Sequence, residues 1–264
     1  MAVANQKGGV GKTTSVINLA AEFAQKGYKT LVVDLDPQGN ASSGLGVGLR
    51  EGSKDLFDLF LEQTSLQSII VQANNVSDKL YVAPSSRDLI GVEVELGKKP
   101  GRELILRSQI KLLLNSFDCI FIDCPPSCGL LTLNALGAAH YVLIPVQAEY
   151  YALEGITLLL DTVQFVKETF NPSLDLIGVF VTMYDSRTCL SADVAKEIKK
   201  FFKDLAFRTV IPRNIRISES PSHSLPISLY APSSKGALAY KALAKELEKR
   251  LFGLISKGYI KEAS

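Results

Sequence analysis

The stretch Gln6-Lys7-Gly8-Gly9-Val10-Gly11-Lys12-Thr13-Thr14 stands between an apolar run at residues 2–5 and a segment of helical periodicity at residues 13–26. Three glycines in four residues let the backbone curl until successive N–H groups point inward at phosphate oxygens. The following helix adds the positive end of its dipole. Lys12 can reach the β- and γ-phosphates of a nucleotide, and the Thr13 hydroxyl can bind Mg²⁺. The stretch therefore predicts a phosphate-binding loop between a strand and a helix.

Apolar runs that resemble strands alternate with helical patterns along the rest of the chain. The predicted strands are residues 2–5, 30–34, 79–83, 119–123, 140–146, 176–182 and 208–211. The predicted helices are residues 13–26, 102–115, 152–168, 191–203 and 234–251. Strands that are apolar on both faces and alternate with helices indicate a buried parallel sheet with right-handed crossovers. We therefore predict one doubly wound α/β domain over residues 1–252, with a mostly parallel sheet flanked by helices, and a C-terminal tail over residues 253–264.

Composition narrows the class of protein. Hydrophobic residues make up 47% of the chain and charged residues 21%, which favours a globular core over disorder. No apolar run approaches the roughly 18 residues of a membrane span, and the first residues lack a signal-peptide pattern, so a cytoplasmic protein is expected. Four cysteines and two histidines show no metal-binding spacing, so neither a zinc site nor a disulfide framework is expected.

The net charge of +2 is unevenly distributed. Residues 1–186 hold 14 Lys and Arg against 20 Asp and Glu, a net charge of −6. Residues 187–264 hold 15 Lys and Arg against 7 Asp and Glu, a net charge of +8. A basic C-terminal third is either a solvated face or a surface for an anionic partner.

Carboxylates follow two of the predicted strands at the edge where ligands bind in such sheets. Asp34 and Asp36 are two residues apart at a strand end, so they point to the same side and can face a Mg²⁺-bound phosphate and an attacking water. The apolar strand at residues 119–123 ends in Asp123, which is placed to hold Mg²⁺ through a water. Pro125 and Pro126 then end that strand and begin a loop.

The phosphate loop departs from the common G-x-x-x-x-G-K-[ST] pattern because Gln6 replaces its first glycine, and it carries an additional lysine, Lys7. The string K-G-G-x-G-K-T resembles the deviant Walker A motif of the ParA/MinD family of P-loop NTPases. In that family this lysine reaches across a dimer interface to the partner's nucleotide, much as an arginine finger does. The resemblance therefore implies an ATP-dependent homodimer in which Lys7 acts in catalysis beside Lys12.

The string D-x-D-P-Q-G-N-A at residues 34–41 resembles the ParA/Soj partition branch. The resemblance implies that Asp36 is catalytic and orients the hydrolytic water, and that Asp34 supports it as a possible metal ligand. Residues 209–222 resemble the family's adenine loop, in which Pro212 and Asn214 match the positions that contact the base. The implied cofactors are ATP and Mg²⁺, and the implied nucleotide-binding residues are Lys7, Gly8, Gly9, Val10, Gly11, Lys12, Thr13, Thr14, Pro212 and Asn214, with Thr13 and Asp123 on the metal.

The resemblance extends from residue 3 to about residue 251 and is nearest to the short chromosomal Soj type. It implies a DNA-partition ATPase that hydrolyses ATP slowly, binds double-stranded DNA without reading its sequence, associates with the nucleoid, and is stimulated by a ParB-type centromere-binding protein. The candidate DNA contacts are Arg187, Arg216, Lys199, Lys200 and Lys203. For the three lysines, a solvated helix face is an equal alternative.

Two other functions stay open. A membrane-cycling ATPase of the MinD type would need a C-terminal amphipathic targeting helix, and residues 245–260 are mildly amphipathic and basic. Gly253 and Gly258 interrupt that segment, and the Asp36-Pro37-Gln38 string belongs to the partition branch, so no stable membrane association is expected. The other alternative is a positioning scaffold that uses nucleotide only as a switch.

Overall fold

The computed structural model describes residues 1–49, 52–150 and 154–256. Its sheet has seven strands in this part of the chain: β1 (Ala2–Val3), β2 (Thr30–Asp34), β3 (Val71–Gln72), β4 (Leu80–Ala83), β5 (Cys119–Asp123), β6 (Tyr141–Gln147) and β7 (Asp175–Thr182). The strand order is β3-β4-β2-β5-β1-β6-β7, and every pairing is parallel except that of β3 with β4. The predicted doubly wound, mostly parallel sheet is therefore confirmed.

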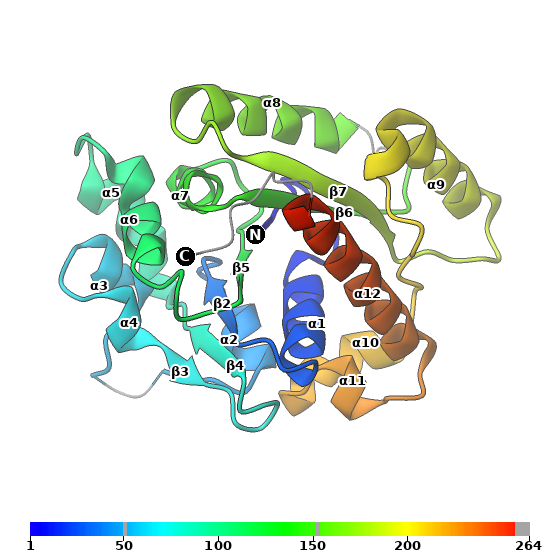
Figure 1. Cartoon of the computed structure of the whole chain (residues 1–264), viewed down its shortest axis with the longest axis horizontal. Coiled ribbons are helices and arrows are strands. Elements are labelled where there is room, and N and C mark those ends of the chain that lie inside the picture. Colours follow the sequence, from blue (N-terminus) through cyan, green and yellow to red (C-terminus); the bar gives the residue numbers. More distant parts are fainter. Residues whose placement is uncertain (50–51, 151–153, 257–264) are drawn as a thin grey trace.

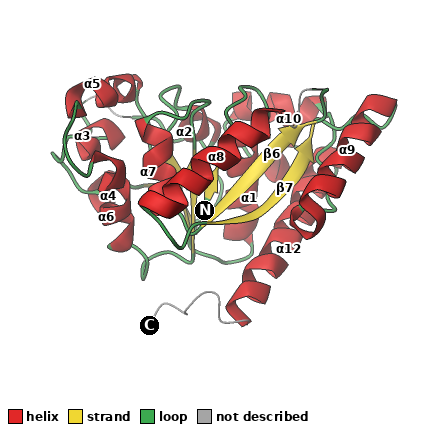
Figure 2. Cartoon of the chain, turned by 90° about the horizontal axis from the view of Figure 1, so that it is seen from above, coloured by secondary structure: helices red, strands yellow, loops and turns green. Residues whose placement is uncertain are grey.

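Helices cover both faces of this sheet (Figures 1 and 2). The α-helices are α1 (Lys12–Gln25), α2 (Asn40–Gly44), α3 (Leu56–Phe60), α4 (Leu66–Ile69), α5 (Val92–Leu96), α6 (Ile105–Lys111), α7 (Leu130–Ala138), α8 (Glu154–Thr169), α9 (Cys189–Phe202), α10 (Ile215–Glu219), α11 (Ile227–Tyr230) and α12 (Lys235–Ser256). Short 3-10 helices span Arg87–Gly91, Arg102–Leu104, Lys203–Leu205 and Ser220–His223.

An apolar cluster lies on each face of the sheet, between the strands and the helices that cover them, because successive side chains of a strand point to opposite faces. Val32 of β2 packs in a cluster with residues of α1, α2, α11 and α12. Its neighbours Leu31 and Val33 pack in the other cluster, which includes residues of α3 to α9. All three side chains are fully buried, which explains the uninterrupted apolar run of the sequence.

The central strand β1 determines where the site lies. Ala2 pairs with Ile122 of β5 on one side and with Val142 of β6 on the other. The chain goes from β1 toward β2 in one direction and later adds β6 and β7 in the other, so the loop after β1 lies at the switch point of the sheet. Ligands of open α/β sheets bind at such a point, beyond the carboxyl ends of the strands.

The predicted strand at residues 208–211 is wrong. Only isolated bridges, Val179 with Ala206 and Tyr184 with Pro212, join this region to the chain around β7 in the described residues. The reason is a competing acceptor: the backbone N–H groups of Arg208 and Thr209 both donate to the carboxylate of Glu246 on α12. Because consecutive N–H groups of a strand point in opposite directions, one of these two donors is lost to pairing with β7.

The other predicted elements differ mainly at their ends. The predicted helix at residues 102–115 is a 3-10 turn followed by α6, which ends at Lys111. The last helix continues through Gly253 to Ser256, so the predicted boundary at residue 252 falls within it, and residues 257–264 lie outside the described part. Within the described ranges, no helix combines the length and apolarity that crossing a membrane requires.

Candidate nucleotide site

The loop between β1 and α1 has the backbone conformation that its glycines predict. Gly9 has φ 73° and Gly11 has φ 88°, both in the left-handed region that residues with a Cβ rarely adopt. Gly11 forms the N-cap of α1, and its carbonyl accepts the first bond of that helix from Ser15. The loop thus ends at a helix N-terminus whose free N–H groups and dipole favour a phosphate.

Hydrogen bonds hold this loop to the ends of the neighbouring strands. The Asn5 amide donates to the carbonyl of Pro145 in β6 at 2.8 Å and accepts from the Lys7 N–H at 3.0 Å. The Thr182 hydroxyl at the end of β7 donates to the Val10 carbonyl at 2.8 Å. The phosphate cradle is therefore preorganised, and binding need not order it.

Lys12 lies among carboxylates at the base of the loop. Its side chain is buried, and its ammonium donates to the Lys7 carbonyl at 3.1 Å. Burial lowers the pKa of Lys12, while the nearby Asp123 and Asp36 act to raise it. A lysine held in this way by a backbone carbonyl can swing to a phosphate without breaking an ion pair.

Asp123 at the end of β5 is completely buried, and neither carboxylate oxygen has a hydrogen-bond partner among the described residues. Burial, together with the neighbouring charge of Asp34, raises the pKa of Asp123 well above its usual value, although the Thr13 hydroxyl is near enough to lower it. A buried carboxylate without a partner is costly, and a cation offsets that cost.

These residues suit Mg²⁺ better than a transition metal. The described residues contain no cluster of three or more His, Cys, Asp or Glu side chains that could enclose a metal ion. Mg²⁺ retains several waters and commonly takes only one or two protein ligands together with phosphate oxygens. Asp123 and Thr13 could therefore hold Mg²⁺, which would supply positive charge to the phosphates of a nucleotide.

Asp34 anchors the loop that follows β2. One of its oxygens accepts both the N–H and the hydroxyl of Ser42, at 2.8 and 2.7 Å, and the other accepts the Asp36 N–H at 3.3 Å. Burial raises the pKa of Asp34 to about 6, against the effect of the two Ser42 bonds. Because both oxygens are engaged, Asp34 positions the loop, which makes it a weaker candidate for a direct metal ligand than Asp123.

Asp36 is nearly buried, at 9% exposure, and its carboxylate accepts the Gln38 N–H at 3.0 Å. Its own carbonyl accepts the Ser85 hydroxyl, which ties the loop after β2 to the end of β4. The charge of Asp36 acts on both Lys12 and Asp123, so the structure brings these three predicted residues into one site.

The Lys7 side chain contacts a residue outside its own phosphate loop. Its ammonium forms an ion pair with the carboxylate of Glu149, just beyond β6. The two side chains are 39% and 44% exposed. The sequence singled out Lys7 but gave Glu149 no defined partner, because the two residues are 142 positions apart in the chain.

A cavity of about 390 Å³ opens beside the phosphate loop. Gly11 and Thr14 line it on one side, and the predicted adenine residues Pro212 and Asn214 line it on the other. Met183 and Tyr240, which the sequence did not single out, also line it. Asn214 has a second task, because its side-chain oxygen caps α10 by accepting the Arg216 N–H at 2.9 Å. The cavity has the size and position for a base whose phosphates lie on the loop.

The candidate DNA contacts are all exposed but are not equally free. Arg187 forms a bidentate pair with Asp185, and Arg216 pairs with Glu219. Lys199 and Lys200 lie in the last turn of α9, and Lys203 follows it. None of these three lysines takes part in an ion pair among the described residues, which leaves them available to an anion or simply to water.

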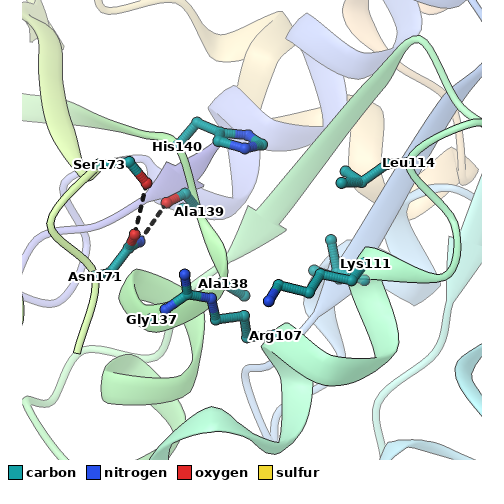
Figure 3. Close-up of a pocket in the computed structure, with 10 residues that line it drawn as sticks. Arg107, Lys111, Leu114, Gly137, Ala138, Ala139, His140, Asn171 and Ser173 are labelled. Atoms are coloured by element: carbon teal, nitrogen blue, oxygen red, sulfur yellow. Dashed lines mark hydrogen bonds between the residues drawn. The ribbon is translucent and has the colours of Figure 1, made fainter. Parts of the chain in front are cut away.

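A second, smaller cavity of about 80 Å³ lies away from this site, beside the amino end of β6 (Figure 3). Arg107, Lys111 and His140 line it, and the buried Asn171 side chain donates to the carbonyls of Leu136 and Ala139. Arg107 likewise donates to the Phe170 carbonyl at 2.6 Å. These donors and cations complement the C-terminal ends of α6, α7 and α8, which carry free carbonyls and partial negative charge. The cavity is therefore explained by helix capping.

Comparisons with known proteins agree with this geometry. Residues 1–176 match a family model described as AAA domain. The sporulation initiation inhibitor protein Soj of Bacillus subtilis is 48% identical over 94% of this chain and 97% of its own length. The chromosome-partitioning ATPase Soj of Treponema pallidum is 48% identical over 93% and 95%.

Solved structures of similar shape include nucleotide complexes. A cobyrinic acid a,c-diamide synthase from Mycobacterium smegmatis, with bound ADP and magnesium, is 36% identical over 95% of this chain and 94% of its own, with a TM-score of 0.81. The cell division ATPase MinD of Pyrococcus furiosus is 29% identical over 94% and 97%, with a TM-score of 0.76. Taken with the phosphate loop, the two aspartate-bearing strand ends and the near-complete overlap with Soj proteins, these matches show that the chain belongs to the ParA/Soj family of partition ATPases, within the P-loop ATPases of the ParA/MinD class.

Proposed function

We propose that this protein binds ATP with Mg²⁺ and hydrolyses it slowly to drive DNA partition. One observation carries the proposal: the fully buried Asp123 carboxylate has no partner among the described residues and lies beside Lys12 and Thr13. Such a carboxylate calls for a cation, and the loop and the 390 Å³ cavity next to it provide for the phosphates and the base.

Different side chains and backbone groups have different roles in ATP hydrolysis. Loop N–H groups and Lys12 hold the β- and γ-phosphates. Thr13 and Asp123 would hold Mg²⁺, which would supply positive charge near the phosphates when bound. Asp36, nearly buried and at the same edge of the sheet, orients the attacking water. Asp34 keeps Asp36 in place through the loop that both carboxylates anchor.

Membership of the family supports the finer parts of this proposal. ATP brings two copies together, Lys7 of each reaches the partner's nucleotide, and the paired basic surfaces bind duplex DNA without reading its sequence. A ParB-type protein stimulates hydrolysis and returns the dimer to monomers. The protein then works in the cytoplasm on the nucleoid. The net charge of +8 over residues 187–264 supports the DNA-binding step.

Two measurements test this proposal. Lys12→Ala should abolish ATP binding in a calorimeter, because it removes the cation that reaches the β- and γ-phosphates, and unchanged affinity would disprove the site. DNA co-sedimentation should require ATP and fail with ADP or without nucleotide. A parallel experiment uses liposomes in place of DNA. ATP-dependent sedimentation with liposomes but not with DNA would support the MinD-type alternative.

A further inference from the structure

The helix that follows the Asp123 loop lacks a cap of its own. Residues 124–129 connect β5 to α7, and Gly129 is the N-cap of α7 but offers no side-chain oxygen. The first turn of α7 contains no acidic residue either. A helix N-terminus without a side-chain acceptor leaves N–H donors unpaired and a partial positive charge unopposed.

Glu93, on a different helix, supplies the missing cap. It lies on α5, and its carboxylate accepts the Leu130 N–H at 2.6 Å from a position 37 residues earlier in the chain. It forms no ion pair among the described residues, so the N-terminus of α7 is its electrostatic partner there. The contact therefore combines a charge-assisted hydrogen bond with a favourable helix-dipole interaction.

Gly129 is matched to this contact. A Cβ at residue 129 would lie 2.2 Å from the Glu93 carboxylate oxygen, far inside van der Waals contact. The backbone does not itself demand glycine, because φ −75° and ψ −170° are open to any residue and are typical of an N-cap. The missing side chain at 129 is thus explained by the approach of Glu93.

The start of α7 is connected to the nucleotide site by the short loop that precedes this helix. Asp123 ends β5, and only six residues separate it from Leu130. The Thr132 hydroxyl of α7 donates to the Ser127 carbonyl at 2.6 Å, and Cys128 contacts Gln6 at the entrance of the phosphate loop. A shift at the start of α7 would therefore be transmitted to the loop that borders Asp123 and Gln6.

We propose that Glu93 is a positioning residue for ATP hydrolysis, which acts by capping α7 and so fixing the loop of residues 124–129 beside the nucleotide phosphates. The inference rests on the proposed function, because it assumes that the phosphates lie on the loop that ends at Lys12. Glu93 itself does not touch the nucleotide.

The test compares kcat with ATP affinity. Glu93→Ala should lower kcat about tenfold, in line with the cost of small misplacements in an active site, while the ATP dissociation constant stays within about twofold. Gly129→Ala should have the same effect, because its methyl group displaces Glu93, and the two changes together should be no worse than either alone. Glu95→Ala is the matched control: it removes the same charge from the same helix, and Glu95 has no partner among the described residues.

A rescue variant distinguishes a positioning role of Glu93 from a general loss of protein stability. Gly129→Ser in the Glu93→Ala background supplies a local N-cap hydroxyl and should restore most of kcat. Circular dichroism and the melting temperature confirm that each variant is folded, and Glu93→Gln provides a milder change of the same shape. Wild-type kcat in Glu93→Ala, a fall in kcat matched by lost ATP affinity or lost folded protein, or no recovery in the double variant would each overturn the inference. The wild type and Lys12→Ala in the same assay report on the proposed function independently.

Discussion

The ion pair between Lys7 and Glu149 predicts that the free protein restrains its own dimerisation. If Lys7 serves the partner's nucleotide, its ammonium must first leave the Glu149 carboxylate that holds it in its own chain. Glu149→Gln removes the charge but keeps the size and hydrogen-bonding shape of the side chain. We expect this variant to form the ATP-bound dimer more readily than the wild type.

The solvent exposure of the Lys7–Glu149 ion pair determines how large a change in dimer affinity we expect. At 39% and 44% exposure, the pair is well solvated and contributes about 0.2–1 kcal/mol. Each dimer breaks two such pairs, one per chain, so the gain on association is about 0.4–2 kcal/mol. That corresponds to a dimer dissociation constant lower by roughly 2- to 30-fold, an effect that should shrink as salt rises.

Sedimentation velocity over a protein concentration series, with a non-hydrolysable ATP analogue and Mg²⁺, measures this constant directly. The matched control is Glu62→Gln, which breaks the pair of Glu62 with Lys99, also surface-exposed, at 60% and 41%. The control should leave the dimer unchanged. A weaker or unchanged dimer in Glu149→Gln, or an equal gain in the control, would refute the restraint and would favour a role for Glu149 within the dimer itself.

Three further predictions follow from the site and its supports. Asp36→Ala should bind ATP and dimerise, yet hydrolyse about 10²–10⁴ times more slowly in a phosphate-release assay; a variant that stays monomeric with ATP would show a structural role instead. The double variant Arg187→Ala, Arg216→Ala should dimerise normally but bind any duplex more weakly, with a log–log salt slope shallower by roughly 0.9 per lost contact; full affinity at every salt concentration would place the DNA surface elsewhere. Burial alone would raise the pKa of Glu246, but the hydrogen bonds that it accepts from residues 208 and 209 hold that pKa below its ordinary value near 4.5. Its stabilisation is therefore present above that pH and lost as the pH falls through the folded-state pKa. Glu246→Gln should accordingly lower the melting temperature at pH 7 by roughly 2–4 °C, for about 1 kcal/mol, and the difference from the wild type should shrink as the pH falls below the ordinary pKa of a glutamate in a calorimetric pH series.

The sequence predicted the sheet well because its signal is local. Strands buried on both faces, such as β2, require continuous apolar runs, and the turn residues beside them mark their ends. Helix α7 was missed for the opposite reason. Its residues Leu130–Ala138 are mostly apolar and mostly buried, so no polar stripe reveals a helical period.

Partners that depend on tertiary contact were beyond the sequence. The phosphate loop and Asp123 could be predicted because their chemistry fixes their spacing. Ser42, which holds Asp34, and Glu149, which holds Lys7, carry no such pattern. Glu246 is a third example, because it accepts the N–H groups of residues 208 and 209 from 38 and 37 positions away, where local apolarity predicted a strand.

The relation of the two candidate DNA-binding arginines to the nucleotide cavity also becomes visible only in three dimensions. Arg216 lies between Ile215 and Ile217, both of which line the cavity. Arg187 follows a segment in which Tyr184 is bonded to the backbone of residues 211 and 213. Arg216 is therefore flanked by two cavity-lining residues, and Arg187 lies three residues after a tyrosine that is bonded to the cavity wall. Under the proposed function, a substitution of Ile215 or Ile217 would change both the cavity for the base and the surroundings of Arg216. A DNA-binding defect at α10 should therefore be separable from a nucleotide-binding defect only by substitutions that spare these two cavity-lining side chains.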